Sequence, residues 1–203
     1  LLQQIDEQTD RAKSTVRSLL EFSRDKEFKK EMIPLRELFE ETILFLKGQI
    51  PARVEIIFDI PEGVDIFADK QRIQHALLNL IKNAVESIVD EGKVCVRARK
   101  HLAGALHGEN EICDSKFRGR CIGDCQLEQD TVDIVVEDTG VGIPADMLPR
   151  VFDPFFTTKD VGKGSGLGLF ITTEIVEEHN GCMGVDSKVG EGTCFLIRLP
   201  LKE

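Results

Sequence analysis

The chain has 203 residues, of which 41% are hydrophobic and 31% charged, and this composition is typical of a soluble globular protein with one sizeable domain and an appendage. The formal net charge of -10 disfavours nucleic acid as the main partner, because the phosphate backbone attracts basic surfaces. Apolar runs such as Ile134 to Val136 are too short to cross a bilayer, and no signal-peptide pattern opens the sequence. We therefore expect a cytoplasmic chain without membrane contact of its own.

Residues 1–30 are predicted to form one helix. Small or apolar residues recur along it at alternating spacings of four and three: Ile5, Thr9, Ala12, Val16, Leu19 and Ser23. This heptad seam suits a helical hairpin or bundle, and we expect it to mediate homodimerisation because the rest of the helix is polar. The alternative is a surface helix that packs on its own domain.

Residues 31–203 are predicted to form a single α/β domain. The first expected elements are a helix that begins at about 35 and ends near Gly48 and Pro51, strands at 54–58 and 64–67 around the turn at 61–63, and a helix at about 70–89. They are followed by strands at 93–99 and 131–137, a helix at 166–179, and strands near 182–187 and 193–199. Asp69 is the expected N-cap of the 70–89 helix. Together these elements predict a two-layer α/β sandwich with one mixed sheet and helices on one face.

An insertion at about 101–130 separates two of the expected strands, and it is far longer than an ordinary hairpin loop. It contains His101, His107, Cys113, Cys121 and Cys125, and Cys95 lies on the preceding strand. Three interpretations stay open: a flexible loop, a zinc or iron–sulfur site, and thiol oxidation. The cysteine spacing specifies neither a metal nor a disulfide.

Two motifs supply polar groups that suit a nucleotide. In the first, NLIKNA, Asn79 and Asn83 are four residues apart and share a helix face, where a neutral amide can offer oxygen to Mg²⁺. The second, DTGVGIP, directly follows a strand. There Asp138 can accept a hydrogen bond from an exocyclic amine, while Gly140 and Gly142 let the backbone approach a flat ring. Taken singly, these motifs also fit a polar helix face and a tight turn.

Two further motifs follow in the chain. The run FDPFFTTK at 152–159 looks like a hinged flap with apolar anchors, although core aromatics are an equally good interpretation. The run GKGSGLGL at 162–169 leads flexible backbone into a helix start, where exposed amides and the positive helix end can bind phosphate oxygens. It is neither the Walker nor the dinucleotide pattern, because Lys163 lies inside the glycine run.

In this order the four motifs resemble the N, G1, F and G2 boxes of the sensor histidine kinase family, within the wider ATPase group of gyrase, Hsp90 and MutL. The run GEGTCF at 190–195 is similar to the last glycine box of that family. The resemblance covers about 35–200, and LLEFSR at 19–24 resembles the second helix of the family's dimerisation and phosphotransfer hairpin. The run FFTTK is most similar to the nitrogen-regulator and sporulation-kinase branch.

The resemblance implies a Bergerat-type fold that binds ATP and Mg²⁺. It implies that Asn83 ligates Mg²⁺ with Asn79 assisting at the phosphates, and that Asp138 binds the adenine amine. The other implied nucleotide-binding positions are Gly140, Gly142, Lys159, Lys163, Gly164, Gly166, Leu167, Gly168 and Thr193. Residues from about 145 to 166 would form a mobile lid.

Two departures from the family pattern stand out. Glu86 and Ser87 occupy positions where many relatives carry a basic residue and then an aromatic one. None of the four histidines (His75, His101, His107 and His179) lies in a His-Glu/Asp box on a stalk helix, and His75 and His179 are interpreted as structural. The phosphoacceptor is therefore expected upstream of residue 1, and no catalytic residue is assigned within the chain.

The implied activity is transfer of the ATP γ-phosphoryl to a histidine, with a response-regulator receiver domain as partner and a possible origin in the cytoplasmic portion of a membrane-bound sensor. An ATP hydrolase of the gyrase type is disfavoured, because those relatives carry a glutamate general base where this chain has Asn79. A nucleotide-gated interaction module is disfavoured by the intact boxes. A serine kinase that regulates sigma factors is disfavoured by the N-terminal helix.

Overall fold

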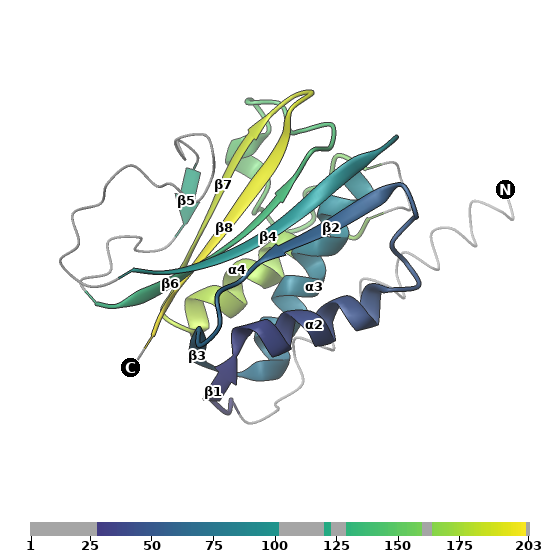
Figure 1. The fold of residues 1–203 in the computed structure, drawn as a ribbon. Coiled ribbons are helices and arrows are strands. Elements are labelled where there is room, and N and C mark those ends of the chain that lie inside the picture. The colour runs from purple at the N-terminus through teal and green to yellow at the C-terminus, as the bar shows by residue number, and fades with distance from the viewer. Residues whose placement is uncertain (1–27, 102–119, 123–128, 160–163, 202–203) are drawn as a thin grey trace, which may run out of the picture.

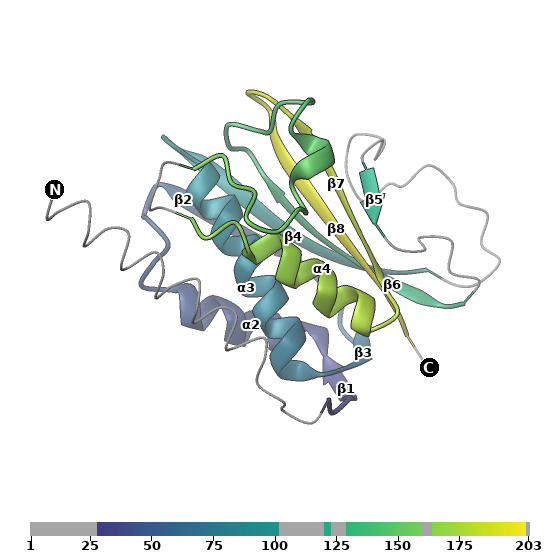
Figure 2. The same ribbon diagram turned by 180° about the vertical axis from the view of Figure 1, so that it is seen from behind.

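The computed structural model describes residues 28–101, 120–122, 129–159 and 164–201. Most of the helix predicted at 1–30 and most of the insertion lie outside these ranges, so both stay predictions. The described residues form a six-stranded mixed sheet with α-helices packed on one of its faces (Figures 1 and 2). The predicted mixed α/β architecture is therefore confirmed.

The order of strands across the sheet is β2 (Val54–Asp59), β4 (Gly92–His101), β6 (Thr131–Asp138), β8 (Gly192–Pro200), β7 (Cys182–Lys188) and β5 (Arg120–Ile122). β2 runs parallel to β4, and the other neighbours are antiparallel. The helices are α2 (Leu35–Leu46), α3 (Lys70–Ser87) and α4 (Gly168–Glu178), with a short 3-10 turn η1 (Leu148–Arg150). A second, two-stranded sheet pairs β1 (Glu31–Pro34) with β3 (Asp65–Ala68).

Helix α3 packs between α2 and α4 against the sheet and carries a buried apolar stripe (Figure 2). Its start is capped as predicted, since the Asp69 carboxylate accepts a hydrogen bond from the Arg72 N–H at 3.1 Å. The predicted apolar stripe is buried throughout: Ile73, Leu77, Leu80, Ile81, Ala84 and Ile88. Burial of a large aliphatic side chain contributes about 1.5–3 kcal/mol, so this stripe fixes the helix on the sheet and sets the direction of its polar face.

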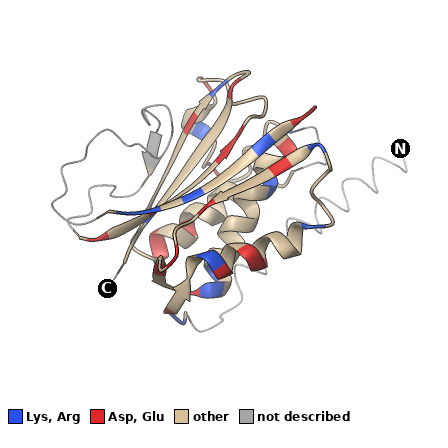
Figure 3. Cartoon of the chain, in the orientation of Figure 1, with Lys and Arg blue, Asp and Glu red and all other residues tan. Residues whose placement is uncertain are grey.

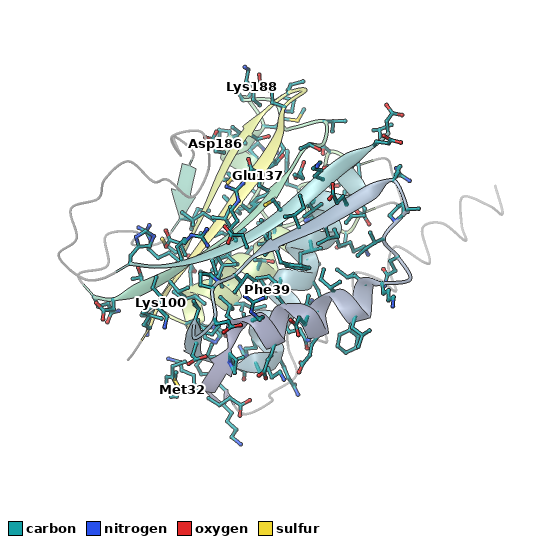
Figure 4. All side chains as sticks on the ribbon, in the orientation of Figure 1. Met32, Phe39, Lys100, Glu137, Asp186 and Lys188 are labelled. Carbon is teal, nitrogen blue, oxygen red and sulfur yellow. The ribbon has the colours of Figure 1, made fainter. Side chains whose placement is uncertain are left out.

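Helix α2 covers the edge of the sheet near β2. Leu35, Leu38 and Phe39 are buried. Phe39, labelled in Figure 4, has its ring 6.4 Å from the Phe58 ring of β2. Acidic and basic residues are interspersed over the described helices and strands (Figure 3). The charge of this part of the molecule is thus distributed over its surface.

The two strands predicted around the turn at 61–63 form but do not pair with each other. β2 instead lies parallel to β4, and β3 pairs with β1, a strand that was not predicted. Parallel strands need a crossover connection, and here the chain passes through β3 and α3 before it returns as β4. β1 and β5 are four and three residues long, too short for a periodic pattern to mark them.

Candidate functional site

A cavity of about 540 Å³ opens between α3, α4 and the ends of β6 and β8, on the helical side of the sheet. Many of the predicted nucleotide-binding residues line it: Asn79, Asn83, Asp138, Gly142, Lys159, Gly164, Gly166, Gly168 and Thr193. Gly140 and Leu167 are absent from the lining, and Lys163 lies outside the described residues. The fold thus brings together motifs that are far apart in the sequence.

At one end of the cavity Asp138 terminates β6 with its side chain 4% exposed to solvent. Its Oδ1 accepts hydrogen bonds from the Gly140 N–H and the Ser87 hydroxyl, both at 2.8 Å. Burial raises the pKa of Asp138, and the hydrogen bonds from Gly140, Ser87 and the Thr193 backbone act in the opposite direction. The site therefore presents a dehydrated carboxylate held in place by three donors.

The loop after Asp138 requires glycine for two different reasons. A Cβ on Gly140 would lie 1.9 Å from the Ser87 Oγ, so the absent side chain of Gly140 makes room for the hydrogen bond to Asp138. Gly142 has a φ of +71°, and a Cβ there would lie 2.2 Å from the carbonyl oxygen of Lys188. The backbone of this loop therefore lies against both α3 and β7, as a wall of the cavity.

At the other end of the cavity the two asparagines of α3 have different partners. The Nδ2 of Asn79 donates to the carbonyl oxygen of Gly168 at 3.4 Å, which joins α3 to the start of α4. The Nζ of Lys159 lies 3.0 Å from the Oδ1 of Asn83 and also forms an ion pair with Glu86. A positive charge thus rests against the amide oxygen that was predicted to ligate Mg²⁺.

The Phe-rich and second Gly-rich stretches form the remaining wall. Phe152 is buried in the core, while Phe156 lines the cavity with the Arg150 guanidinium 4.8 Å from its ring centre. Phe155 is 59% exposed and has a φ of +66°, an uncommon conformation for a residue with a side chain. A Cβ on Gly166 would lie 2.4 Å from the carbonyl carbon of Phe155, so the two stretches are in backbone contact. The core interpretation thus holds for Phe152, and the hinged flap stays a prediction.

Several lining residues were not predicted to bind the nucleotide. His75 was interpreted as structural, yet it lines the cavity one helical turn before Asn79, a spacing that could have indicated it. Glu86 and Ser87 were noted only as departures from the family pattern, and both line the cavity. The structural interpretation of His179 is confirmed: its ring is buried, its Nε2 accepts from the Asp69 N–H at 2.9 Å, and burial lowers its pKa.

Residues 68–203 match the family model of histidine kinase-, DNA gyrase B- and HSP90-like ATPases, so the chain belongs to this ATP-binding family. Its similar relatives are sensor kinases. It is 36% identical over 199 residues to the sensor kinase CckA of Brucella abortus, an alignment that covers 97% of this chain and 20% of CckA.

Solved structures of histidine kinases share the fold. The full-length kinase ShkA in complex with AMPPNP superposes with a TM-score of 0.69 at 25% identity, over 96% of this chain and 36% of ShkA. The kinase ThkA in complex with the response regulator protein TrrA also gives 0.69, at 23% identity, over 98% of this chain and 49% of ThkA. Among the described residues, no helix combines the length and apolar character that a membrane span requires.

Proposed function

We propose that this chain is the ATP-binding catalytic part of a sensor histidine kinase, which transfers the γ-phosphoryl of Mg-ATP to a histidine upstream of this sequence. The observation that carries the proposal is the arrangement of one cavity. It has the buried carboxylate of Asp138 at one end, and the amide oxygen of Asn83 and the start of α4 at the other. A purine base and a triphosphate need these two environments at opposite ends of one site.

At the adenine end, Asp138 accepts a hydrogen bond from the exocyclic amine of the base. Its carboxylate is already desolvated, so recognition of the amine replaces little water, whereas a carbonyl at the same ring position would place an acceptor against the buried carboxylate with no proton between them. Thr193 lies on β8 opposite Asp138, beside the base, and the Gly142 backbone approaches the ring. These contacts select adenine over guanine.

At the phosphate end, the start of α4 directs its backbone amides at the phosphate oxygens. Gly164, Gly166 and Gly168 line this part of the cavity. Leu167, which lies between Gly166 and Gly168, is buried at the start of α4. Lys159 provides a cation for the phosphates, and Lys163 in the same lid a second one. Gly140 contributes by positioning Asp138.

The residues at this end also fit Mg²⁺. Asn83 offers a neutral oxygen that already accepts a cationic group, the ammonium of Lys159, at 3.0 Å. Mg²⁺, when bound, neutralises charge on the phosphates as the γ-phosphoryl leaves. Asn79 carries an amide, which cannot remove a proton from water, and this favours transfer to a histidine over hydrolysis.

The phosphohistidine would pass its phosphoryl to the receiver domain of a response regulator. ThkA, whose structure contains its response regulator, is a precedent for such a partner. We further propose homodimerisation through residues 1–30, on the strength of the heptad seam. Sedimentation of the chain with and without these residues tests the dimer, and identical monomers at high concentration would contradict it.

Calorimetric titration with ATP tests the site. Asp138→Asn is expected to abolish measurable ATP binding, while Asp59→Asn, a change in an exposed carboxylate on β2, serves as the matched control. Asn83→Ala should weaken binding mainly when Mg²⁺ is present. Unchanged ATP affinity in Asp138→Asn would refute the assignment of the cavity.

Incubation with γ-labelled ATP tests the location of the acceptor. This chain is expected to bind ATP without acquiring acid-labile phosphate, because none of its histidines lies in a phosphoacceptor box. Stable phosphohistidine at His75 or His179 would show that the acceptor is not upstream.

A further inference from the structure

Helix α3 presents a row of polar side chains to the cavity, spaced one helical turn apart. The row consists of Ser87, Asn83, Asn79 and His75, and all four residues line the cavity. Residues four apart in a helix lie on neighbouring turns of one side, about 6 Å apart along the axis. The row therefore extends over about 18 Å of the cavity wall.

The row has a direction with respect to the proposed nucleotide. At the adenine end the Ser87 hydroxyl donates a hydrogen bond to Asp138 at 2.8 Å. Two turns away, Asn79 is joined by its hydrogen bond of 3.4 Å to the start of α4, where the phosphates are proposed to bind. From the base to the phosphates the row thus runs toward the N-terminal end of α3. His75 is its next member in that direction, one turn beyond Asn79.

The charges around the cavity give this position further weight. Among the described residues, the basic side chains that line the cavity are His75, Lys82 and Lys159. Both lysines are paired with one carboxylate: the Lys82 ammonium lies 3.9 Å from Glu86, and Lys159 forms a closer ion pair with the same residue. Because Glu86 offsets part of the positive charge of the lysines, a phosphate at this end of the cavity gains from a further donor. The imidazole of His75 can supply one.

We propose that His75 contacts the terminal phosphate of ATP and makes the site prefer ATP to ADP. The inference rests on the proposed function, from which it takes the orientation of the nucleotide. A ring N–H of the imidazole donates to a phosphate oxygen, and the protonated ring adds a positive charge beside a negatively charged group. The terminal phosphate is the part of ATP that ADP lacks. A contact at this end of the row therefore distinguishes the substrate of phosphoryl transfer from its product.

The helix that carries His75 holds it in place before a nucleotide binds. His75 is half-buried, and its neighbours Ile73, Ala76 and Leu77 are fully buried in the core. These contacts fix the rotation of α3 about its axis, so the direction in which the His75 side chain leaves the helix is set in advance. A contact made from a preorganised position loses less conformational entropy on binding.

Calorimetric titration of the whole chain with Mg-ATP and with Mg-ADP tests the proposal. His75→Ala should lower the affinity for ATP about tenfold or more, the loss expected for one hydrogen bond to a charged group, and should leave the affinity for ADP unchanged. His75→Gln retains an N–H donor without the charge and should recover part of the loss. The matched control is Gln71→Ala, one turn farther along α3 and outside the cavity lining, which should alter neither affinity.

Phosphorus NMR of bound Mg-ATP locates the contact on the nucleotide. The γ-phosphorus resonance should differ between His75→Gln and the parent, while the α-phosphorus resonance should not. Circular dichroism verifies that each variant is folded. Equal losses of ATP and ADP affinity in His75→Ala, or no loss of either, would overturn the proposal, because His75 would then support the fold or lie away from the phosphates. A parent chain that binds neither nucleotide would instead refute the proposed function, and this inference with it.

Discussion

Glu86 is positioned to compete with the nucleotide for Lys159. Its carboxylate forms an ion pair with the Lys159 ammonium, which also lies 3.0 Å from the Asn83 Oδ1. For Asn83 to ligate Mg²⁺ and for Lys159 to contact phosphate, this arrangement must open. Glu86→Gln removes the competing charge and is therefore expected to tighten the binding of Mg-ATP.

The size of the effect follows from the exposure of the pair. The Lys159 and Glu86 side chains are 34% and 37% exposed, and ion pairs at such exposure contribute about 0–1 kcal/mol. The expected gain in ATP affinity is thus at most about fivefold, since about 1.4 kcal/mol corresponds to a factor of ten. Because the interaction is partly screened, the gain should shrink as the salt concentration rises.

Calorimetric titration with Mg-ATP at low and high salt measures this gain. The matched control is Glu41→Gln, which breaks the ion pair between Glu41 of α2 and Lys70 of α3. These side chains are 46% and 39% exposed and lie away from the cavity, so ATP affinity should stay unchanged. Weaker binding in Glu86→Gln would refute the reasoning, since Glu86 would then support the bound nucleotide or its metal.

Three further changes test other parts of the structure. Because burial raises the pKa of Asp138 in the folded protein, its effect on folding is favourable at low pH and is lost as the pH rises through that pKa. The stability of Asp138→Asn relative to the parent, measured by urea unfolding, should therefore increase with pH. The ATP affinity of the parent, measured by calorimetry, should fall on acidification. Arg198→Leu leaves the buried Asp133 carboxylate without its guanidinium partner and should cost about 3–5 kcal/mol of unfolding free energy, whereas a loss below about 1 kcal/mol would indicate an exposed pair. Gly142→Ala forces a side chain into a φ of +71° and against the Lys188 carbonyl, so thermal unfolding should show a loss of about 1–3 kcal/mol together with weaker ATP binding.

The inner side of the domain was predictable because its signals are local. The buried stripe of α3 follows helical periodicity, and the N-cap of this helix is a single residue, Asp69. Each nucleotide-binding motif is a short run whose residue types indicate its local backbone conformation. The order of the boxes then indicated the family, and the cavity lined by Asn79, Asp138 and Gly166 agrees with that expectation. Local patterns of this kind survive folding because tertiary contacts reinforce them.

The outer face of the sheet, turned away from the helices, could not be predicted from the sequence, because it depends on strand register. The cysteines near the insertion were considered together, but Cys182 and Cys194 are distant in sequence and were not connected with them. Only the pairing of β7 with β8 brings Cys182 and Cys194 to the same face of the sheet. The pair of Asp133 with Arg198 was missed for the same reason, since each residue alone looks like a solvated strand position.

The two departures from the family pattern acquire a common explanation at the end of α3. Ser87 stands where an aromatic side chain is usual, and its hydroxyl donates to Asp138 at 2.8 Å, close beside Gly140. A bulky ring at that position could not donate this hydrogen bond, which opposes the effect of burial on the carboxylate. Glu86 of α3 occupies the position where many relatives carry a basic residue. It forms an ion pair with Lys159, which follows the Phe-rich stretch on the other side of the cavity. We therefore predict that Lys159, rather than the residue at position 86 of α3, supplies positive charge to the phosphates, so Lys159→Ala should weaken ATP binding.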